Sequence, residues 1–292
     1  MLKASLDRLY DTFNHPDSAF DPIQVVRRYP HVEDREVVAF VAAGLAFGRV
    51  ASVVQSVEAV CNVLGQAPAA FVRGFDPARQ GGPLRALGHR WTRGEDFVGM
   101  MWVLRRLIED YGSLENAVAV GVDPQGADIG PALERFASAA RAIDLRPAYG
   151  RRPRQPGVYY FFARPSTGSA CKRLNLFLRW MVRRDGVDPG GWAAVPTRQL
   201  IVPLDTHTIR VGQCLRLTRH RTPGWNMAVE ITAALRALDP EDPVRYDFAL
   251  CHLSMMGACG FGTSRGNVQC PLRGHCTGRR RARRYARPKN RS

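Results

Sequence analysis

The stretch RQLIVPLDTHTIRVGQCLRL, residues 198–217, joins a buried run to a helix. The apolar residues 200–202 end at Pro203, and the amphipathic pattern from Ile209 to Leu217 predicts a helix. Asp205 stands just before that helix, where an aspartate side chain accepts hydrogen bonds from free backbone N–H groups. We therefore expect Asp205 to cap the helix. A cap also holds a carboxylate rigidly, so the same residue is a candidate for chemistry.

Helix signals dominate the rest of the chain, and convincing alternating strands are absent. The segment REVVAFVAAGLAFGRV, residues 35–50, is apolar on almost every side from Val37 to Phe47, which predicts a central buried helix. We predict an all-α fold. Further helices are expected over 97–112 and 225–239, and after the Asp-Pro pairs at 21–22 and 242–243. Loops are expected over 76–93, 122–131 and 145–157. Residues 158–163 suit either a strand or the start of a helix.

The bulk composition points to a folded protein with a polyanionic partner. The chain has 292 residues, 45% of them hydrophobic, and a net charge of +16. Such a charge favours nucleic acid over an anionic membrane surface. Residues 277–292 hold eight Lys or Arg and no acid, so the rest carries 16 − 8 = +8, and we expect a disordered basic tail. No signal peptide and no apolar run of ~20 residues is visible, which predicts a cytoplasmic protein.

A lysine follows a glycine-containing turn in RPSTGSACKRLNLFLRWMVRR, residues 164–184. A helix is expected from residue 169 or 170. Its apolar face would be Leu174, Phe177, Leu178 and Met181, and its opposite stripe Lys172, Asn175, Arg179 and Arg183. Lys172 then lies in the first turn, where free amides bind phosphate and a glycine lets a nucleic-acid backbone approach. A lysine on such a polar stripe is normally solvated.

GSACK, the amphipathic helix and LDTHTIRV together resemble the helix-hairpin-helix DNA glycosylases of the endonuclease III superfamily. The resemblance covers about residues 35–280, and the aspartate segment is its most specific part. It places Lys172 at the family's nucleophilic lysine and Asp205 at its catalytic aspartate. The DNA-contacting positions it implies are Gly168, Ser169, Ala170 and Arg173 in the hairpin and Arg49 in the loop after the 35–50 helix, together with its neighbours Gly48 and Val50.

The sequence departs from the family pattern at two points. Ala170 replaces the second hairpin glycine, and the gap of 205 − 172 = 33 positions is longer than in endonuclease III. The longer gap, which makes 184–199 a loop, resembles the archaeal 8-oxoguanine glycosylase branch and makes an oxidised purine our first expectation for the substrate. Overall, the layout resembles a poorly characterised bacterial branch of the superfamily.

The resemblance also implies an architecture and a setting. Residues 1–34 and 201–276 would form one helical lobe, residues 35–200 a helical barrel lobe carrying the hairpin, and residues 277–292 the tail. The implied partner is double-stranded DNA with a damaged base, bound by a monomer without a membrane, in the cytoplasm at the bacterial nucleoid.

The residue types fit cleavage of an N-glycosidic bond. A carboxylate at Asp205 would stabilise positive charge on the sugar, and an uncharged Lys172 amine would form a Schiff base that permits strand cleavage as an AP lyase. If Lys172 only contacts phosphate, Asp205 would activate water instead. The competing class is a non-catalytic DNA- or RNA-binding protein on the same scaffold. His207 either orients the loop or is a buried, satisfied histidine, and Tyr160, Phe161, Phe162 and Trp180 suit either a base pocket or the core.

Four cysteines near the C-terminal end raise the question of a metal. Cys259, Cys270 and Cys276 resemble three ligands of the family's [4Fe–4S] cluster, but the second ligand of the usual pattern is missing. Cys251 would be the fourth by another route, or His252 or His275 would complete a zinc site. The remaining alternative is thiols without a metal, with Cys251 in the core. Cys61, Cys171 and Cys214 lie within helical patterns and are expected to be structural.

Overall fold

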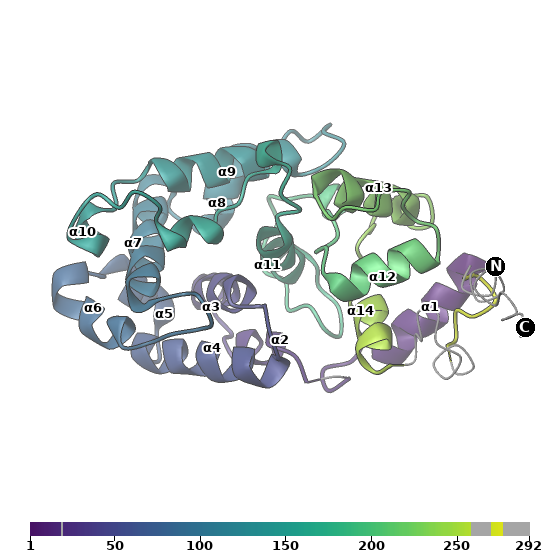
Figure 1. Cartoon of the computed structure of the whole chain (residues 1–292), viewed down its shortest axis with the longest axis horizontal. Helices are drawn as coiled ribbons and strands as arrows, with labels where there is room; N and C mark the ends of the chain where they lie inside the picture. Colours follow the sequence, from purple (N-terminus) through teal and green to yellow (C-terminus); the bar gives the residue numbers. More distant parts are fainter. Residues whose placement is uncertain (19, 258–269, 277–292) are drawn as a thin grey trace, which may run out of the picture.

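The computed structural model describes every residue except 19, 258–269 and 277–292. Its described residues form 14 α-helices and three short 3-10 helices and contain no β-strand, which confirms the all-α prediction (Figure 1). The α-helices are α1 (Leu2–Phe13), α2 (Ile23–Val26), α3 (Val32–Gly44), α4 (Val50–Leu64), α5 (Pro68–Arg73), α6 (Pro77–Arg85), α7 (Gly94–Tyr111), α8 (Leu114–Ala119), α9 (Gly130–Ala142), α10 (Arg146–Tyr149), α11 (Lys172–Val182), α12 (Thr206–Cys214), α13 (Trp225–Arg236) and α14 (Asp247–Met255). The 3-10 helices are η1 (Gly157–Tyr160), η2 (Pro165–Thr167) and η3 (Thr197–Gln199).

Several predicted boundaries were wrong. The expected loops over 76–93 and 145–157 contain α6 and α10, because Pro77 and Pro147 each stand in a first helical turn, where proline is tolerated. Residues 157–160 form η1 and no strand. The proline at 243 does not start a helix: α14 begins at Asp247, and the Asp242 carboxylate pairs with Arg183 instead. The basic tail lies outside the described residues.

The central helix α3 is buried from Glu36 to Gly44, as its all-round apolar sequence predicted. It packs against α11, α5 and α2. Glu36 is its one buried acid, and its carboxylate accepts hydrogen bonds from the Leu114 N–H at 3.1 Å and the Trp192 indole at 3.3 Å. Burial raises the pKa of Glu36 to about 7. The carboxyl group thus ties α3 to the start of α8 and to the loop that follows α11.

Helix α11 lies between two groups of helices (Figure 1). On one side it packs on α3, and on the other side lie α12, α13 and α14. The N-terminal helix α1 packs on α14, so the two ends of the described fold meet. Among the described residues, none of the helices is both long and apolar enough to cross a membrane.

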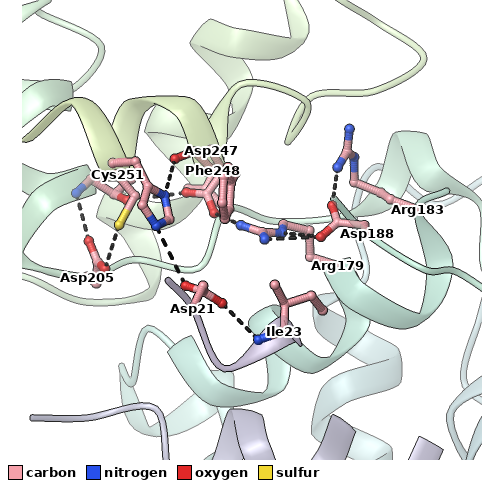
Figure 2. A network of polar contacts seen from close by, with 12 residues as sticks. Asp21, Ile23, Arg179, Arg183, Asp188, Asp205, Asp247, Phe248 and Cys251 are labelled. Atoms are coloured by element: carbon pink, nitrogen blue, oxygen red, sulfur yellow. Dashed lines mark hydrogen bonds and ion pairs between the residues drawn. The ribbon is translucent and has the colours of Figure 1, made fainter. Parts of the chain in front are cut away.

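The polar stripe of α11 differs from an ordinary solvated face, because Asn175, Arg179 and Arg183 are buried. Arg179 reaches Asp247 Oδ2 at 2.7 Å and Asp188 Oδ1 at 3.1 Å. Arg183 pairs with Asp188, and its Nε donates to Asp242 at 2.9 Å (Figure 2). Buried charges persist in proteins where they are paired and hydrogen-bonded. The carboxylates that make this face suitable for burial come from α14 and from two loops, so the helix sequence alone did not reveal it.

We predict that Arg179→Met lowers the free energy of unfolding by about 3–5 kcal/mol, because removing one partner leaves buried carboxylates without their full set of donors. The neighbouring Arg184 is exposed, so Arg184→Met should change stability by less than about 0.5 kcal/mol. Urea unfolding followed by circular dichroism measures both. Equal losses in the two variants would contradict a structural role for the buried pair.

Candidate active site

Asp205 caps α12, as predicted, but only one of its carboxylate oxygens does so. Oδ1 accepts from the backbone N–H of His207 at 2.9 Å and of Thr208 at 2.8 Å. Oδ2 lies 3.4 Å from the Cys251 thiol, which donates to it, and 3.9 Å from the Lys172 amine. The cap therefore fixes the carboxylate and leaves its second oxygen directed at other side chains.

Lys172 is the first residue of α11 and approaches Asp205 from a different part of the chain. Its Nζ donates to the Ala46 carbonyl, just beyond the end of α3, at 3.1 Å. The Lys172 and Asp205 side chains retain 31% and 18% of their exposure, so both remain open to a ligand. The structure thus brings together the two residues that the sequence selected, 33 positions apart.

The pair lines a cavity of about 500 Å³. That volume lies within the ~300–1,000 Å³ range typical of small-molecule pockets. Most of the lining surface is apolar, but Asp21, Arg179, Asp247 and His252 also line the cavity besides the pair. Among the lining residues are Phe47, Gly48, Val53, Leu176, Trp180, Leu204, Ile209, Cys251 and Met255.

The surroundings of Asp205 favour its ionised form. Burial opposes the charge, but the Lys172 ammonium, the Thr208 N–H and the Cys251 thiol outweigh burial and hold the pKa of Asp205 below its usual 3.8. Burial and the nearby Asp205 carboxylate raise the pKa of Cys251 well above its usual value. At neutral pH the cavity therefore presents a carboxylate beside a protonated thiol.

A network of buried polar side chains links α12 and α14 (Figure 2), and several of its members also line the cavity. The Thr208 hydroxyl donates to Asp247 Oδ1 at 3.2 Å, and Asp247 Oδ2 accepts from Arg179. Burial raises the pKa of Asp247 to about 6 despite the arginine. His252 Nε2 lies 3.8 Å from Asp21, whose other oxygen caps α2 at the Ile23 N–H.

The hairpin that precedes Lys172 uses two left-handed backbone conformations. Gly168 has φ +77° and Cys171 has φ +47°, a backbone region that residues other than glycine rarely adopt. Ser169 Oγ accepts from the Cys171 N–H, and the Ala170 carbonyl accepts from Asn175. Gly168 and the side chain of Ser169 stand at or near the surface, beside the start of α13, where the Gly168 carbonyl accepts from the Trp225 N–H at 3.0 Å.

The other predicted DNA-contacting residues divide into two kinds. Arg49 is exposed at the start of α4 and follows Gly48, which lines the cavity with φ +106°. Arg173 instead turns toward the protein: Nε donates to the Gly44 carbonyl at 2.9 Å, and its guanidinium lies 3.7 Å from the centre of the Tyr160 ring. Burial lowers the pKa of Arg173.

The aromatic and histidine residues named as candidates for a base pocket or the core differ in their burial. Phe161 and Phe162 belong to the core, whereas Trp180 is buried but lines the cavity. Tyr160 is 43% exposed. His207 is half-buried, and its Nδ1 lies 3.0 Å from the Ser254 hydroxyl.

Sequence reasoning missed two features of the site. Cys251 was considered only as a metal ligand or a core residue, yet its thiol contacts Asp205 in the cavity. Phe47 and Trp91 form a stacked aromatic pair at its edge. Trp91 falls inside a stretch expected to be a loop, and no periodic pattern links it to Phe47, which lies more than forty positions earlier.

The metal-ligand residues are not gathered in the part of the chain that the structure describes, where no three His, Cys, Asp or Glu side chains form a group able to hold a metal ion. Cys251 faces Asp205, Cys276 donates to the Arg273 carbonyl, and His275 contacts Ser5. Cys259 lies outside the described residues. The [4Fe–4S] cluster, like the zinc alternative, stays a prediction.

The fold and the cavity define an all-α protein with a lysine–aspartate pair in a pocket. A family described as "Protein of unknown function (DUF2400)" matches residues 21–256, most of the chain, and the protein belongs to this family. The matched range includes both Lys172 and Asp205. Searches of curated proteins and of solved structures gave no match.

We predict that Asp205→Ala and Asp205→Asn differ in stability. Alanine removes the capping acceptor and should cost about 1 kcal/mol, whereas asparagine still caps. Asp76→Ala, which removes the cap of α6 together with a largely exposed ion pair to Arg79, measures what a cap at the surface contributes. Chemical denaturation at pH 7 compares the three variants, and a larger loss for asparagine than for alanine would contradict this assignment.

The lowered pKa of Asp205 also predicts a pH dependence. A carboxyl group with a lowered folded-state pKa contributes stability above its unfolded value of 3.8, and loses it as the pH falls through the folded value. Any stability gap between wild type and Asp205→Asn at pH 7 should therefore close below about pH 4. Unfolding free energies measured across this range test the sign, and a gap that widens toward acid would refute it.

Proposed function

We propose that this protein is a DNA glycosylase that removes a damaged base, with the helix-hairpin-helix architecture implied by its sequence resemblance. The observation that carries the proposal is the meeting of Lys172 and Asp205 at 3.9 Å in the wall of a cavity. The exposed Gly168 turn beside Lys172 and the net charge of +16 support a DNA partner. The long Lys-to-Asp gap makes an oxidised purine the first substrate to test.

The electrostatics favour a charge-stabilising role for Asp205. When the C1′–N bond breaks, its electron pair leaves with the base and positive charge develops on the sugar. An ionised carboxylate held by two backbone N–H groups is preorganised to stabilise that charge. Its lowered pKa makes it a weak proton acceptor, so activation of water is the less suitable task.

Lys172 supplies the further step of a bifunctional enzyme. Its amine, once deprotonated, would attack C1′ as the base departs with the electron pair of the broken C1′–N bond. Cleavage of the C1′–O4′ bond, with a proton taken up by O4′, would then open the sugar ring and give a Schiff base. Strand cleavage by β-elimination then follows from the electron-withdrawing iminium. The cavity suits a base that has left the stack, because its walls are apolar and Trp180 and Phe47 line it.

The competing function, binding without catalysis, has its own support. The cap, the ion pair with Lys172 and the hydrogen bond from the Cys251 thiol can all be read as structural contacts of Asp205. The two functions differ in one measurable respect, which is chemistry at C1′.

We predict that borohydride traps a covalent adduct between the protein and DNA carrying an abasic site. Lys172→Ala and Lys172→Arg should both lose the adduct, because neither forms a Schiff base. Arginine keeps the positive charge beside Asp205 and serves as the matched control for DNA affinity. An adduct that survives in both variants would mean that an amine other than that of Lys172 forms the Schiff base. Base release without any adduct would indicate a monofunctional enzyme.

We predict that Asp205→Asn lowers base release from duplexes containing oxidised purines by at least about a hundredfold, the usual scale for loss of one electrostatic group. Affinity for the same duplex should change little, because asparagine retains the cap. Single-turnover product formation and fluorescence anisotropy measure the two quantities. If wild-type protein releases no base from a broad lesion panel, the enzymatic proposal fails and the binding function stands.

A further inference from the structure

Three aromatic side chains gather at the edge of the cavity. The Phe47 and Trp91 rings stack with centres 4.3 Å apart and an interplanar angle of 22°, and Tyr160 meets Trp91 edge-on at 5.6 Å. Trp91 remains 51% exposed. The Arg90 guanidinium lies 5.3 Å from the centre of the Trp91 ring. The Trp91 ring is thus packed against Phe47 and remains open to solvent, with the Arg90 guanidinium beside it.

Trp91 also borders a separate groove of about 890 Å³. Four exposed arginines line it, namely Arg93, Arg151, Arg152 and Arg154. Glu95 and Asp96 line it too, so the formal charge of these lining groups is 4 − 2 = +2. Asp96 is buried and accepts from the Tyr149 hydroxyl at 2.8 Å and the Arg93 N–H at 2.9 Å, which leaves the arginines as the main exposed charges.

The aromatic pair separates the groove from the cavity. Phe47 lines the cavity that holds Lys172 and Asp205, and Trp91 lines the groove. Because the two rings stack, a ligand in the groove that contacts Trp91 lies one ring away from a side chain that lines the cavity. The two hollows are therefore neighbours across a single aromatic layer.

We propose that this groove binds an unpaired stretch of DNA, with one base stacked on Trp91 and the flanking phosphates on the arginines. Arginines alone would suit any polyanion, but an exposed ring held in place by a second ring provides a stacking platform, which every nucleobase can use. A paired base stacked in a duplex has no free face for Trp91, so the platform selects unpaired nucleotides. The inference rests on DNA being the partner in the proposed function, and not on excision of a base.

The test separates stacking from charge. Binding of the full-length protein to a labelled short oligothymidylate is compared with binding to an oligomer of equal length made of abasic spacer units, by fluorescence anisotropy. Both oligomers carry the same phosphates, so the basic residues 277–292 contribute equally to each. Wild type should bind the oligothymidylate more tightly.

Trp91→Ala should weaken oligothymidylate binding by about 5- to 150-fold and leave binding of the spacer oligomer unchanged, which is the scale of one base–aromatic stack. Trp91→Phe should restore much of the loss. Replacing Arg151, Arg152 and Arg154 by serine should weaken the binding of both oligomers by the same factor and make their affinity less dependent on salt concentration. Trp102→Phe, at a half-buried tryptophan outside the groove, is the matched control and should change neither.

Equal wild-type affinity for the two oligomers, or an equal loss for both in Trp91→Ala, would overturn the proposal and leave a site for polyanions in general. Thermal unfolding of Trp91→Ala checks that the exposed ring is not needed for folding. The result is independent of catalysis: base discrimination without base release would leave this site standing while the glycosylase fails. Base release by a protein that binds the two oligomers equally would support the glycosylase and refute the stacking site.

Discussion

The buried contacts of Arg179 set the geometry of the site. One guanidinium bonds Asp188, in the loop after α11, and Asp247, at the start of α14. Asp247 in turn accepts from Thr208 on α12, so three helices are linked through a single arginine. Lys172 begins the helix that carries Arg179, and Asp205 caps the helix that carries Thr208. The distance between amine and carboxylate therefore depends on a buried ion pair, Arg179 with Asp247, whose members also line the cavity. The protein must keep these buried charges paired, because the loss of one partner costs more than the pair contributes.

The same arrangement shows how one carboxylate can cap a helix and still present an oxygen to the cavity. Capping engages Oδ1 of Asp205 and fixes the rotation of the side chain, which directs Oδ2 toward Lys172 and Cys251. A freely rotating carboxylate would lose conformational entropy each time it met a charged transition state, whereas a capped one has lost it during folding. Stability and reactivity are coupled at this residue. Variants that preserve the cap while removing the charge are for that reason more informative than alanine.

Much of the helical fold and the cap at Asp205 could be predicted from local sequence, whereas the pairing of Lys172 with Asp205 came from the family resemblance. The all-round apolar run of α3, the periodic α7 and α13, and the aspartate before α12 each carry a signal within one element. Features that depend on partners distant in sequence could not be predicted. The stripe with Arg179 and Arg183 has the composition of a solvated face, and only the arrival of Asp188, Asp242 and Asp247 makes burial favourable. Short helices such as α6 and α10 lie in glycine- and proline-rich sequence, where propensity indicates loops and tertiary packing decides otherwise.

The cavity and the arginine groove differ in how they would discriminate ligands. The cavity has mostly apolar walls with the Lys172–Asp205 pair and other charged groups among them, so it can select by shape and by charge development during a reaction. The groove has exposed arginines and a ring face, so in our proposal it would bind backbone and base without reading base identity. The Phe47–Trp91 stack makes the cavity and the groove adjacent. A strand held in the groove would raise the local concentration of its next nucleotides near the cavity, so binding there would precede and favour entry of a base. In this proposal the ring stack is the boundary between a surface that would hold DNA and the cavity that contains Lys172 and Asp205.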